Sequence, residues 1–95
     1  MQGTLSDIVS KITPVLKRHG VLRAAIFGSY ARGEAAKGSD IDVLVELGEG
    51  KTLFDLVELK LDLEEAVGKS IDLLTYNALH PALRSRILAE QVAIL

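Results

Sequence analysis

Two aspartates, Asp40 and Asp42, stand one residue apart where a polar, glycine-containing loop gives way to the apolar run IDVLVEL. A buried strand rarely tolerates even one ionised carboxylate, because removing it from water is costly unless another group compensates its charge. Any fold that this chain adopts must therefore provide a partner for two carboxylates at the start of a strand.

Apolar residues at helical spacing predict a helix within the first twenty residues. Thr4 and Asp7 form a capping box at its start, and Gly20 is a typical stop signal. Pro14 interrupts the pattern, because proline lacks the N–H that an interior helical position needs. We therefore expect a kink at Pro14, or a second short turn capped by Thr13.

Three short segments have the pattern of strands: residues 21–27, 41–47 and 70–76. Two further helices are predicted, over 52–67 and 81–90. Because the first of these connects the second and third strands, those two strands should be parallel and joined by a right-handed crossover.

The helix over 52–67 begins at a second capping box and is expected to end at Gly68. Its pattern is amphipathic, with an acidic side that is most simply a solvated face and alternatively a docking surface. The acidic side comprises Asp55, Glu58, Asp62 and Glu65, and the apolar side comprises Leu53, Leu56, Val57, Leu63 and Val67.

The aspartates have a spacing that suits metal binding. Alternate residues of a strand point to the same side, so Asp40 and Asp42 project together, with Cα atoms about 6 to 7 Å apart. Asp72 begins the third strand and, from an adjacent parallel strand, can face the same spot. Three convergent carboxylates suit Mg²⁺, and two such ions about 3.5 to 4 Å apart would stabilise an in-line displacement. The pattern therefore predicts phosphoryl or nucleotidyl transfer.

A purely structural interpretation of the same residues treats Asp40 as a turn cap, and Asp42 and Asp72 as strand-end residues. It is disfavoured, because burying them without an ion is costly.

A Gly-Ser turn before the aspartates is a candidate phosphate-binding element next to the predicted magnesium site. Gly28 allows close approach of a ligand to the backbone, and Ser29 is expected to be the N-cap of a short helical turn whose N–H groups point at an anion. Arg32 and Lys37 lie in the same loop and could neutralise phosphate charge. For both, a role in solubility is the alternative, and it is the favoured one for Lys37.

Composition excludes several classes of protein. The chain has no cysteine, which rules out disulfide scaffolds and cysteine-based zinc sites, and its net charge of -2 argues against a protein that holds nucleic acid through a basic surface. The apolar runs are too short to cross a bilayer, and nothing at the start of the chain resembles a secretory leader, so the cytoplasm is the expected location. At 95 residues, we expect one domain spanning 1–95.

A glycine-serine pair, ten further residues and then Asp-x-Asp resembles the signature of the DNA polymerase beta-like nucleotidyltransferase superfamily, and GSYARGEAAKGSDIDVLV is similar to its minimal nucleotidyltransferase branch. The resemblance implies an α+β nucleotidyltransferase fold, with a small mixed sheet of three or four strands packed by helices. The matching positions are Gly28, Ser29, Arg32, Gly33, Ser39, Asp40, Asp42 and Asp72.

The resemblance also implies roles for these residues. Gly28 and Ser29 would hold the nucleoside triphosphate, with Arg32 and Ser39 beside it. The three aspartates, Asp40, Asp42 and Asp72, would ligate two Mg²⁺ ions, and Asp72 would help to deprotonate the attacking hydroxyl. The resemblance also implies that ATP is the substrate and that pyrophosphate is the leaving group.

Members of the minimal branch resemble antitoxins that bind HEPN-type toxins and attach AMP to a toxin tyrosine. The leading hypothesis is therefore an antitoxin-like enzyme that adenylylates a partner protein. One alternative is neutralisation of the partner by binding alone, with the C-terminal QVAIL or the last helix as interface. A further alternative is transfer to a small molecule, which is disfavoured because so short a chain leaves little to build a second pocket. The apolar content is also compatible with association, either into an oligomer or with another protein as a hetero-oligomer.

The histidines and several aromatic residues also have structural interpretations. His19 is placed at the end of the first helix and His80 in a loop, and neither has a partner at metal-ligand spacing. Tyr30 either flanks the nucleotide or packs over the short helix. Phe54 and Tyr76 are expected to be core or rim aromatics.

Overall fold

The computed structural model describes residues 4–36 and 38–95, so Lys37 lies outside the described residues. Local patterns set most of the boundaries, since Thr4, Thr52 and His80 each cap the start of a helix and the strands that begin at Arg23, Ile41 and Ile71 follow polar or glycine-containing loops. The elements in chain order are α1 (Leu5–Arg18), β1 (Arg23–Phe27), α2 (Gly28–Arg32), β2 (Ile41–Glu46), α3 (Leu53–Val67), β3 (Ile71–Thr75), a 3-10 turn at Tyr76–Ala78, α4 (Pro81–Glu90) and β4 (Val92–Ala93).

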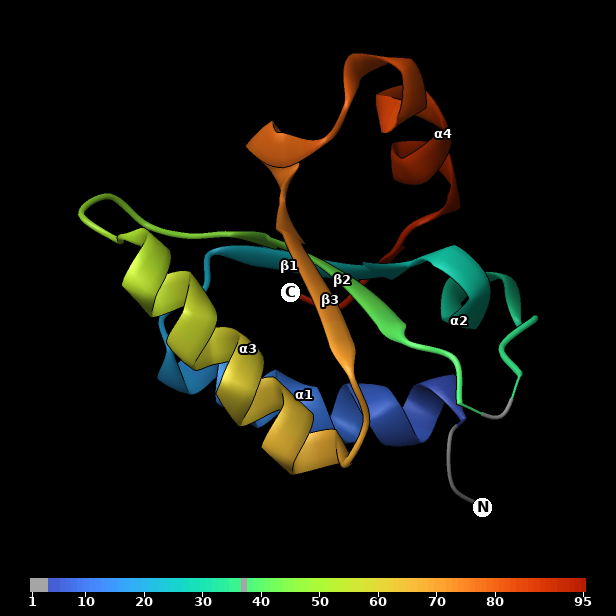
Figure 1. Cartoon of the computed structure of the whole chain (residues 1–95), viewed down its shortest axis with the longest axis horizontal. Coiled ribbons are helices and arrows are strands. Elements are labelled where there is room, and N and C mark those ends of the chain that lie inside the picture. Colours follow the sequence, from blue (N-terminus) through green and yellow to red (C-terminus); the bar gives the residue numbers. More distant parts are fainter. Residues whose placement is uncertain (1–3, 37) are drawn as a thin grey trace.

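The four strands form one mixed sheet in the order β3-β2-β1-β4 (Figure 1). β1 pairs antiparallel with both β2 and β4, whereas β2 and β3 are parallel. The parallel pair joined by α3 confirms the strand-helix-strand unit predicted from the sequence. The α+β class with a small mixed sheet is confirmed as well.

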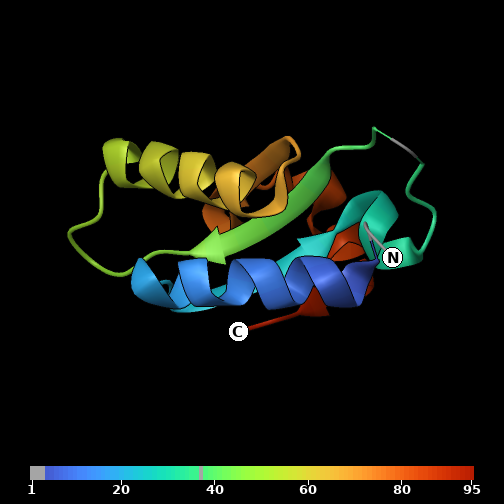
Figure 2. The same ribbon diagram turned by 90° about the horizontal axis from the view of Figure 1, so that it is seen from below.

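Helices cover both faces of this sheet. α1 and α3 lie side by side on one face, and α4 lies on the other (Figures 1 and 2). The larger apolar core fills the space between the first face and its two helices; its fully buried members include Ile12, Leu16, Ile26, Ile41, Val43, Val45, Leu59 and Leu63. A smaller cluster on the second face consists of Phe27, Leu44, Tyr76 and Leu79. The buried Tyr76 agrees with its expected place as a core aromatic.

The helix α1 runs without interruption through Pro14, so the separate second turn expected at Thr13 does not form. Thr4 caps the helix by accepting the N–H of Asp7 at 3.2 Å, as predicted, and a glycine with positive φ, Gly20, follows its end. Pro14 is exposed, and buried apolar residues before and after it hold both halves of α1 against the sheet. Burial of this face therefore outweighs the loss of one helical hydrogen bond.

The predicted apolar side of α3 is only partly correct. Leu63 is fully buried as expected, but Leu53 and Val57, which the pattern assigned to the same side, are exposed. Leu59, which was not assigned to this side, is fully buried. Phe54 is also exposed, contrary to its expected place in the core or at its rim. The capping box at Thr52 and the stop at Gly68 both form as predicted. The helix position was thus readable from its ends, whereas its rotation about the axis was not, because apolar residues occur all round it.

The C-terminal QVAIL is not a free interface. Val92 and Ala93 form the edge strand β4 against β1, and the N–H groups of Ile94 and Leu95 donate to the carbonyl of Ala24 at 2.9 and 3.2 Å. Ile94 and Leu95 pack against the larger core. The sequence pattern did not predict this strand, because two residues carry no alternation to detect.

We expect Ile94→Ala to lower the free energy of unfolding by about 1 to 2 kcal/mol, because it removes apolar contacts of a half-buried side chain. Urea denaturation followed by circular dichroism measures the change. Ala93→Ser, on the exposed neighbour, is the matched control and should shift the free energy by less than about 0.5 kcal/mol. Equal effects of the two substitutions would contradict the placement of Ile94.

Candidate functional site

The carboxylates of Asp42 and Asp72 meet across the parallel pair of strands. Asp42 is the second residue of β2 and is directly opposite Asp72, the second residue of β3. Residues in register on neighbouring strands point to the same face of a sheet, about 4.8 Å apart along the hydrogen-bonding direction. Asp40 precedes β2 by one residue and is close enough for its charge to act on Asp42. The structure therefore brings Asp42 and Asp72 together, with Asp40 near enough for its charge to reach Asp42.

Asp42 is the electrostatic centre of this group. It is half-buried, whereas Asp40 and Asp72 are exposed. Burial, followed by the charge of Asp72, raises the pKa of Asp42 from 3.8 to about 6. A hydrogen bond between the Asp42 and Asp72 carboxyl groups and the charge of Asp40 contribute in the same direction, and Arg32 opposes them. The site thus concentrates negative charge that a cation would relieve.

Gly28 is fixed next to Asp42 by the antiparallel pairing of β1 with β2. Phe27, the last residue of β1, is opposite Asp42, so the chain turns away from the sheet directly beside this carboxylate. Gly28 has a φ of +72°, and a Cβ at this position would overlap the Asp42 carboxylate. Both the conformation and the space therefore require glycine.

Ser29 does not have the capping role expected of it. The short helix α2 begins one residue earlier, at Gly28, and its N-cap is Phe27, which makes no side-chain cap bond. The Ser29 carbonyl instead accepts the N–H of Glu34 at 2.8 Å, which closes the end of α2. The turn forms from backbone geometry, with Gly33 at φ +72°, and not from a hydroxyl cap.

Arg32 is held by two carboxylates that the sequence interpretation did not include. Its Nε donates to Glu34 at 2.8 Å, and a terminal nitrogen donates to Glu90 at 3.2 Å. Glu90 is the last residue of α4, so this pair ties α2 to the C-terminal helix. The positive charge of Arg32 still reaches Asp42 and lowers its pKa.

Ser39 also has a local partner. Its hydroxyl accepts the N–H of Ala36 at 3.0 Å and its own N–H donates to the Ala36 carbonyl, so it closes the loop before Asp40. Lys37, a candidate for phosphate contact in this loop, lies outside the described residues. The loop therefore positions Asp40 through Ser39.

The donor set fits Mg²⁺. In proteins this ion is usually held by one or two carboxylates, with water and substrate phosphate in its other positions. Asp42 and Asp72 provide two carboxylates in contact, and their mutual repulsion is the kind that a divalent cation removes. Within residues 4–36 and 38–95, no group of three or more His, Cys, Asp or Glu side chains lies close enough together to hold a metal ion. Asp42 and Asp72 are therefore the pair best placed to ligate a metal here.

The other candidate residues are structural. Tyr30 is buried in the larger core and does not line the carboxylate edge. His19 bonds Asp62 of α3 through its Nε2 at 2.7 Å, and the Nδ1 of His80 accepts the N–H of Ala82 at the start of α4. The sequence interpretation gave His19 no carboxylate partner, because Asp62 is distant in the chain and close only in the fold.

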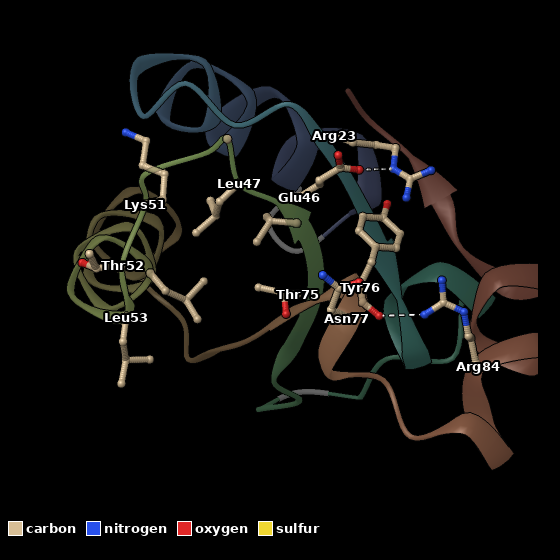
Figure 3. Close-up of a pocket in the computed structure, with 13 residues that line it drawn as sticks. Arg23, Glu46, Leu47, Lys51, Thr52, Leu53, Thr75, Tyr76, Asn77 and Arg84 are labelled. Atoms are coloured by element: carbon tan, nitrogen blue, oxygen red, sulfur yellow. Dashed lines mark hydrogen bonds and ion pairs between the residues drawn. The ribbon is translucent and has the colours of Figure 1, made fainter.

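A cavity of about 580 Å³ lies away from the aspartates. It is bordered by the far ends of β2 and β3, by the start of α3 and by residues around Tyr76 (Figure 3). Arg23 stacks on the Tyr76 ring at 4.0 Å and pairs with Glu46 at 3.3 Å, while Arg84 donates to the Tyr76 carbonyl at 2.9 Å. These cations are engaged with the protein, so we assign the chemistry to the aspartate edge.

Comparison with known proteins agrees with this geometry. Residues 9–94 match the nucleotidyltransferase domain family. The chain belongs to this family. A protein of Methanocaldococcus jannaschii that is named provisionally as a protein adenylyltransferase is 59% identical over 91 residues, which cover 96% of this chain and 98% of the relative. The protein adenylyltransferase MntA of Thermococcus cleftensis is 37% identical over 95 residues, covering 96% of each chain.

Solved structures share the fold of this nucleotidyltransferase. A structure described as a minimal nucleotidyltransferase superposes with a TM-score of 0.81 at 42% identity, covering 94% of this chain and 91% of the other. A chain of a toxin–antitoxin complex with AMP-PNP has a TM-score of 0.79 at 22% identity, covering 92% and 72%. At 22% identity, the match to the toxin–antitoxin chain shows a shared fold and nothing further. In the part of the nucleotidyltransferase that the structure describes, no helix is long and apolar enough to cross a membrane.

We expect Gly28→Ala to destabilise the nucleotidyltransferase by more than Gly33→Ala. Both glycines have φ of +72°, which costs an alanine about 1 to 2 kcal/mol, but an added Cβ meets the Asp42 carboxylate only at Gly28. Free energies of unfolding of the two variants, measured in urea, separate backbone strain from this overlap. Equal losses of unfolding free energy in the two variants would contradict this expectation, because they would mean that the Asp42 side chain moves aside without an energetic penalty.

We expect Asp42→Asn to stabilise the metal-free protein at pH 7.5. A raised carboxyl pKa means that the folded state binds more protons than the unfolded state between about pH 4 and pH 6, so stability falls as the pH rises through this window. After allowance for solvent screening, the gain is about 1 kcal/mol, or a few degrees in Tm. Thermal unfolding in chelator should show a gap between the variant and the wild type at pH 7.5 that closes near pH 4. Glu49→Gln, on an exposed loop residue, is the control, and a gap that is independent of pH would contradict the assignment.

Proposed function

We propose that the chain transfers AMP from ATP to a hydroxyl group of a partner protein, with a tyrosine of a HEPN-type toxin as the acceptor, and that it thereby acts as an antitoxin. The observation that carries the proposal is the apposition of Asp42 and Asp72 across the parallel strands, directly beside Gly28. The protein adenylyltransferase names of its close relatives support the choice of AMP and of a protein acceptor.

In this mechanism, Asp42 and Asp72 would be the central pair that holds Mg²⁺, and Asp40 would be the third ligand. When bound, two magnesium ions would neutralise the charge that develops on the attacking and leaving oxygens. Gly28 and Ser29 form the turn against which the triphosphate lies, because glycine leaves room for phosphate oxygens beside the carboxylates. Asp72, the more exposed of the central pair, accepts the proton of the attacking hydroxyl.

Arg32 supports the site from outside it. Its donors hold Glu34 and Glu90, while its charge still acts on Asp42. We assign Arg32 to orienting α2 and to balancing the negative charge of the aspartates. Ser39 is assigned to holding the loop that positions Asp40.

Residues 1–95 would act as one minimal nucleotidyltransferase domain in the cytoplasm, where ATP and a toxin made in the same cell are both available.

We expect the purified chain, given Mg-ATP, to increase the intact mass of the protein encoded by its neighbouring gene by one or more adenylyl groups. Asp42→Asn should reduce the rate roughly 100-fold, the scale on which loss of a transition-state-stabilising group lowers kcat. Glu49→Gln should react at the wild-type rate. An unchanged mass with wild-type protein, or equal labelling by Asp42→Asn, would overturn the proposal.

Neutralisation by binding alone gives a different result in cells. If the double variant Asp40→Ala with Asp42→Ala protects cells from the partner as well as the wild type does, then complex formation explains the protection and AMP transfer does not. If a small-molecule hydroxyl is the acceptor, labelled AMP will appear in the low-mass fraction and not on the partner.

A further inference from the structure

The outer face of α3 exposes four large apolar side chains. Leu53 is 73% exposed, Phe54 81%, Val57 48% and Leu61 58%. Leu53, Val57 and Leu61 are spaced by four residues, so they lie in one row along the helix, with Phe54 beside the row. We call these four residues the α3 stripe. A contiguous apolar row on a helix that is otherwise strongly charged is typical of a binding surface.

The stripe is not part of the intramolecular core. α3 packs on the sheet and on α1 through Leu59 and Leu63, which are fully buried. Figure 3 shows Leu53 projecting outward from the start of α3, where it also borders the cavity, and Figure 2 shows the length of α3 uncovered by any other element on its outer side. The stripe therefore remains available after the chain has folded.

Acidic residues border the stripe on one side. α3 carries five carboxylates and one lysine, a formal charge of -4. Three of the carboxylates are engaged within the described residues, since Asp55 caps the helix at Thr52, Asp62 pairs with His19, and Glu64 accepts the N–H of Ile71. The other two are Glu58 and Glu65, which are exposed and lie next to the stripe on the helix surface.

We propose that the α3 stripe, with its border of Glu58 and Glu65, docks an amphipathic helix of the partner protein whose apolar face is flanked by lysine or arginine. The inference rests on the proposed function in that the docked protein is the acceptor of AMP. An apolar row gives a helix-in-groove contact its affinity, and the acidic border selects a basic partner and sets its orientation.

The charge pattern argues against a second copy of this chain as the occupant. In an antiparallel pairing of α3 with itself, equivalent edges face each other, so Glu58 and Glu65 would lie against Glu58 and Glu65 of the other copy. Like charges placed together in this way are destabilising. A basic helix in the same place removes the repulsion.

The position of α3 relates the docking surface to the chemistry. α3 ends at Val67, and β3 begins at Ile71, one residue before Asp72. A helix laid along the stripe therefore runs toward the edge of the sheet at which Asp42 and Asp72 begin their strands (Figure 1). A partner held there would have a segment beyond the docked helix within reach of that edge.

The experiment measures binding to the protein encoded by the neighbouring gene, without nucleotide, by biolayer interferometry, alongside AMP transfer. We expect the double variant Val57→Glu with Leu61→Glu to raise Kd at least tenfold, with little change in Tm because both side chains are exposed. Glu58→Lys with Glu65→Lys should raise Kd about threefold to tenfold and weaken its salt dependence. Leu83→Glu, on the similarly exposed Leu83 of α4, is the matched control and should change Kd less than twofold.

The two readouts separate this inference from the proposed function. Asp42→Asn should bind as tightly as wild type while losing transfer, so a loss of docking and a loss of chemistry are distinguishable. Wild-type affinity in the stripe variant, or no binding by the wild type, would overturn the docking surface even if transfer is observed. Sedimentation of the chain alone should show a monomer, and a dimer that the stripe variant dissociates would assign the stripe to a second copy.

Discussion

The pairing of Asp42 with Asp72 across two parallel strands is the constraint on which the site depends. Strand register puts the two carboxylates opposite each other, and apolar residues on either side of Asp42, namely Ile41 and Val43, are fully buried and fix that register. The repulsion between the carboxylates is therefore held in place by hydrophobic burial elsewhere in β2. The fold stores an unfavourable contact that a cation and a nucleotide would relieve, which is a common relation between stability and function at active sites.

Backbone geometry, more than side-chain donors, shapes the turn beside these carboxylates. Gly28 lets β1 end against Asp42 without a clash, and α2 forms with no hydroxyl cap. The long-range pair between Arg32 and Glu90 then ties this turn to α4. The turn on the side where phosphate would lie is thereby restrained by two residues that are 58 positions apart in the chain.

α3 connects the candidate site with the proposed docking surface. Its inner side contributes Leu59 and Leu63 to the core, its C-terminal end leads into the strand that carries Asp72, and its outer side presents the stripe. One helix thus supports the strand register of the candidate site and carries the proposed docking surface. Its connections at Thr52, at Glu64 and through Asp62 to His19 keep both roles in a fixed relation.

The sequence by itself determined the order of the helices and of the first three strands, the caps at Thr4 and Thr52, the parallel strand-helix-strand unit and the apposition of Asp42 and Asp72, because these follow from periodicity and from short spacings along the chain. Tertiary structure alone decided that α1 continues through Pro14, that Val92 and Ala93 form an edge strand, that Arg32 is held by Glu34 and Glu90, and that α3 turns Leu53 and Phe54 to solvent. Each of these depends on which surfaces are buried against one another, and contacts between residues far apart in the chain leave no periodic signal in the sequence.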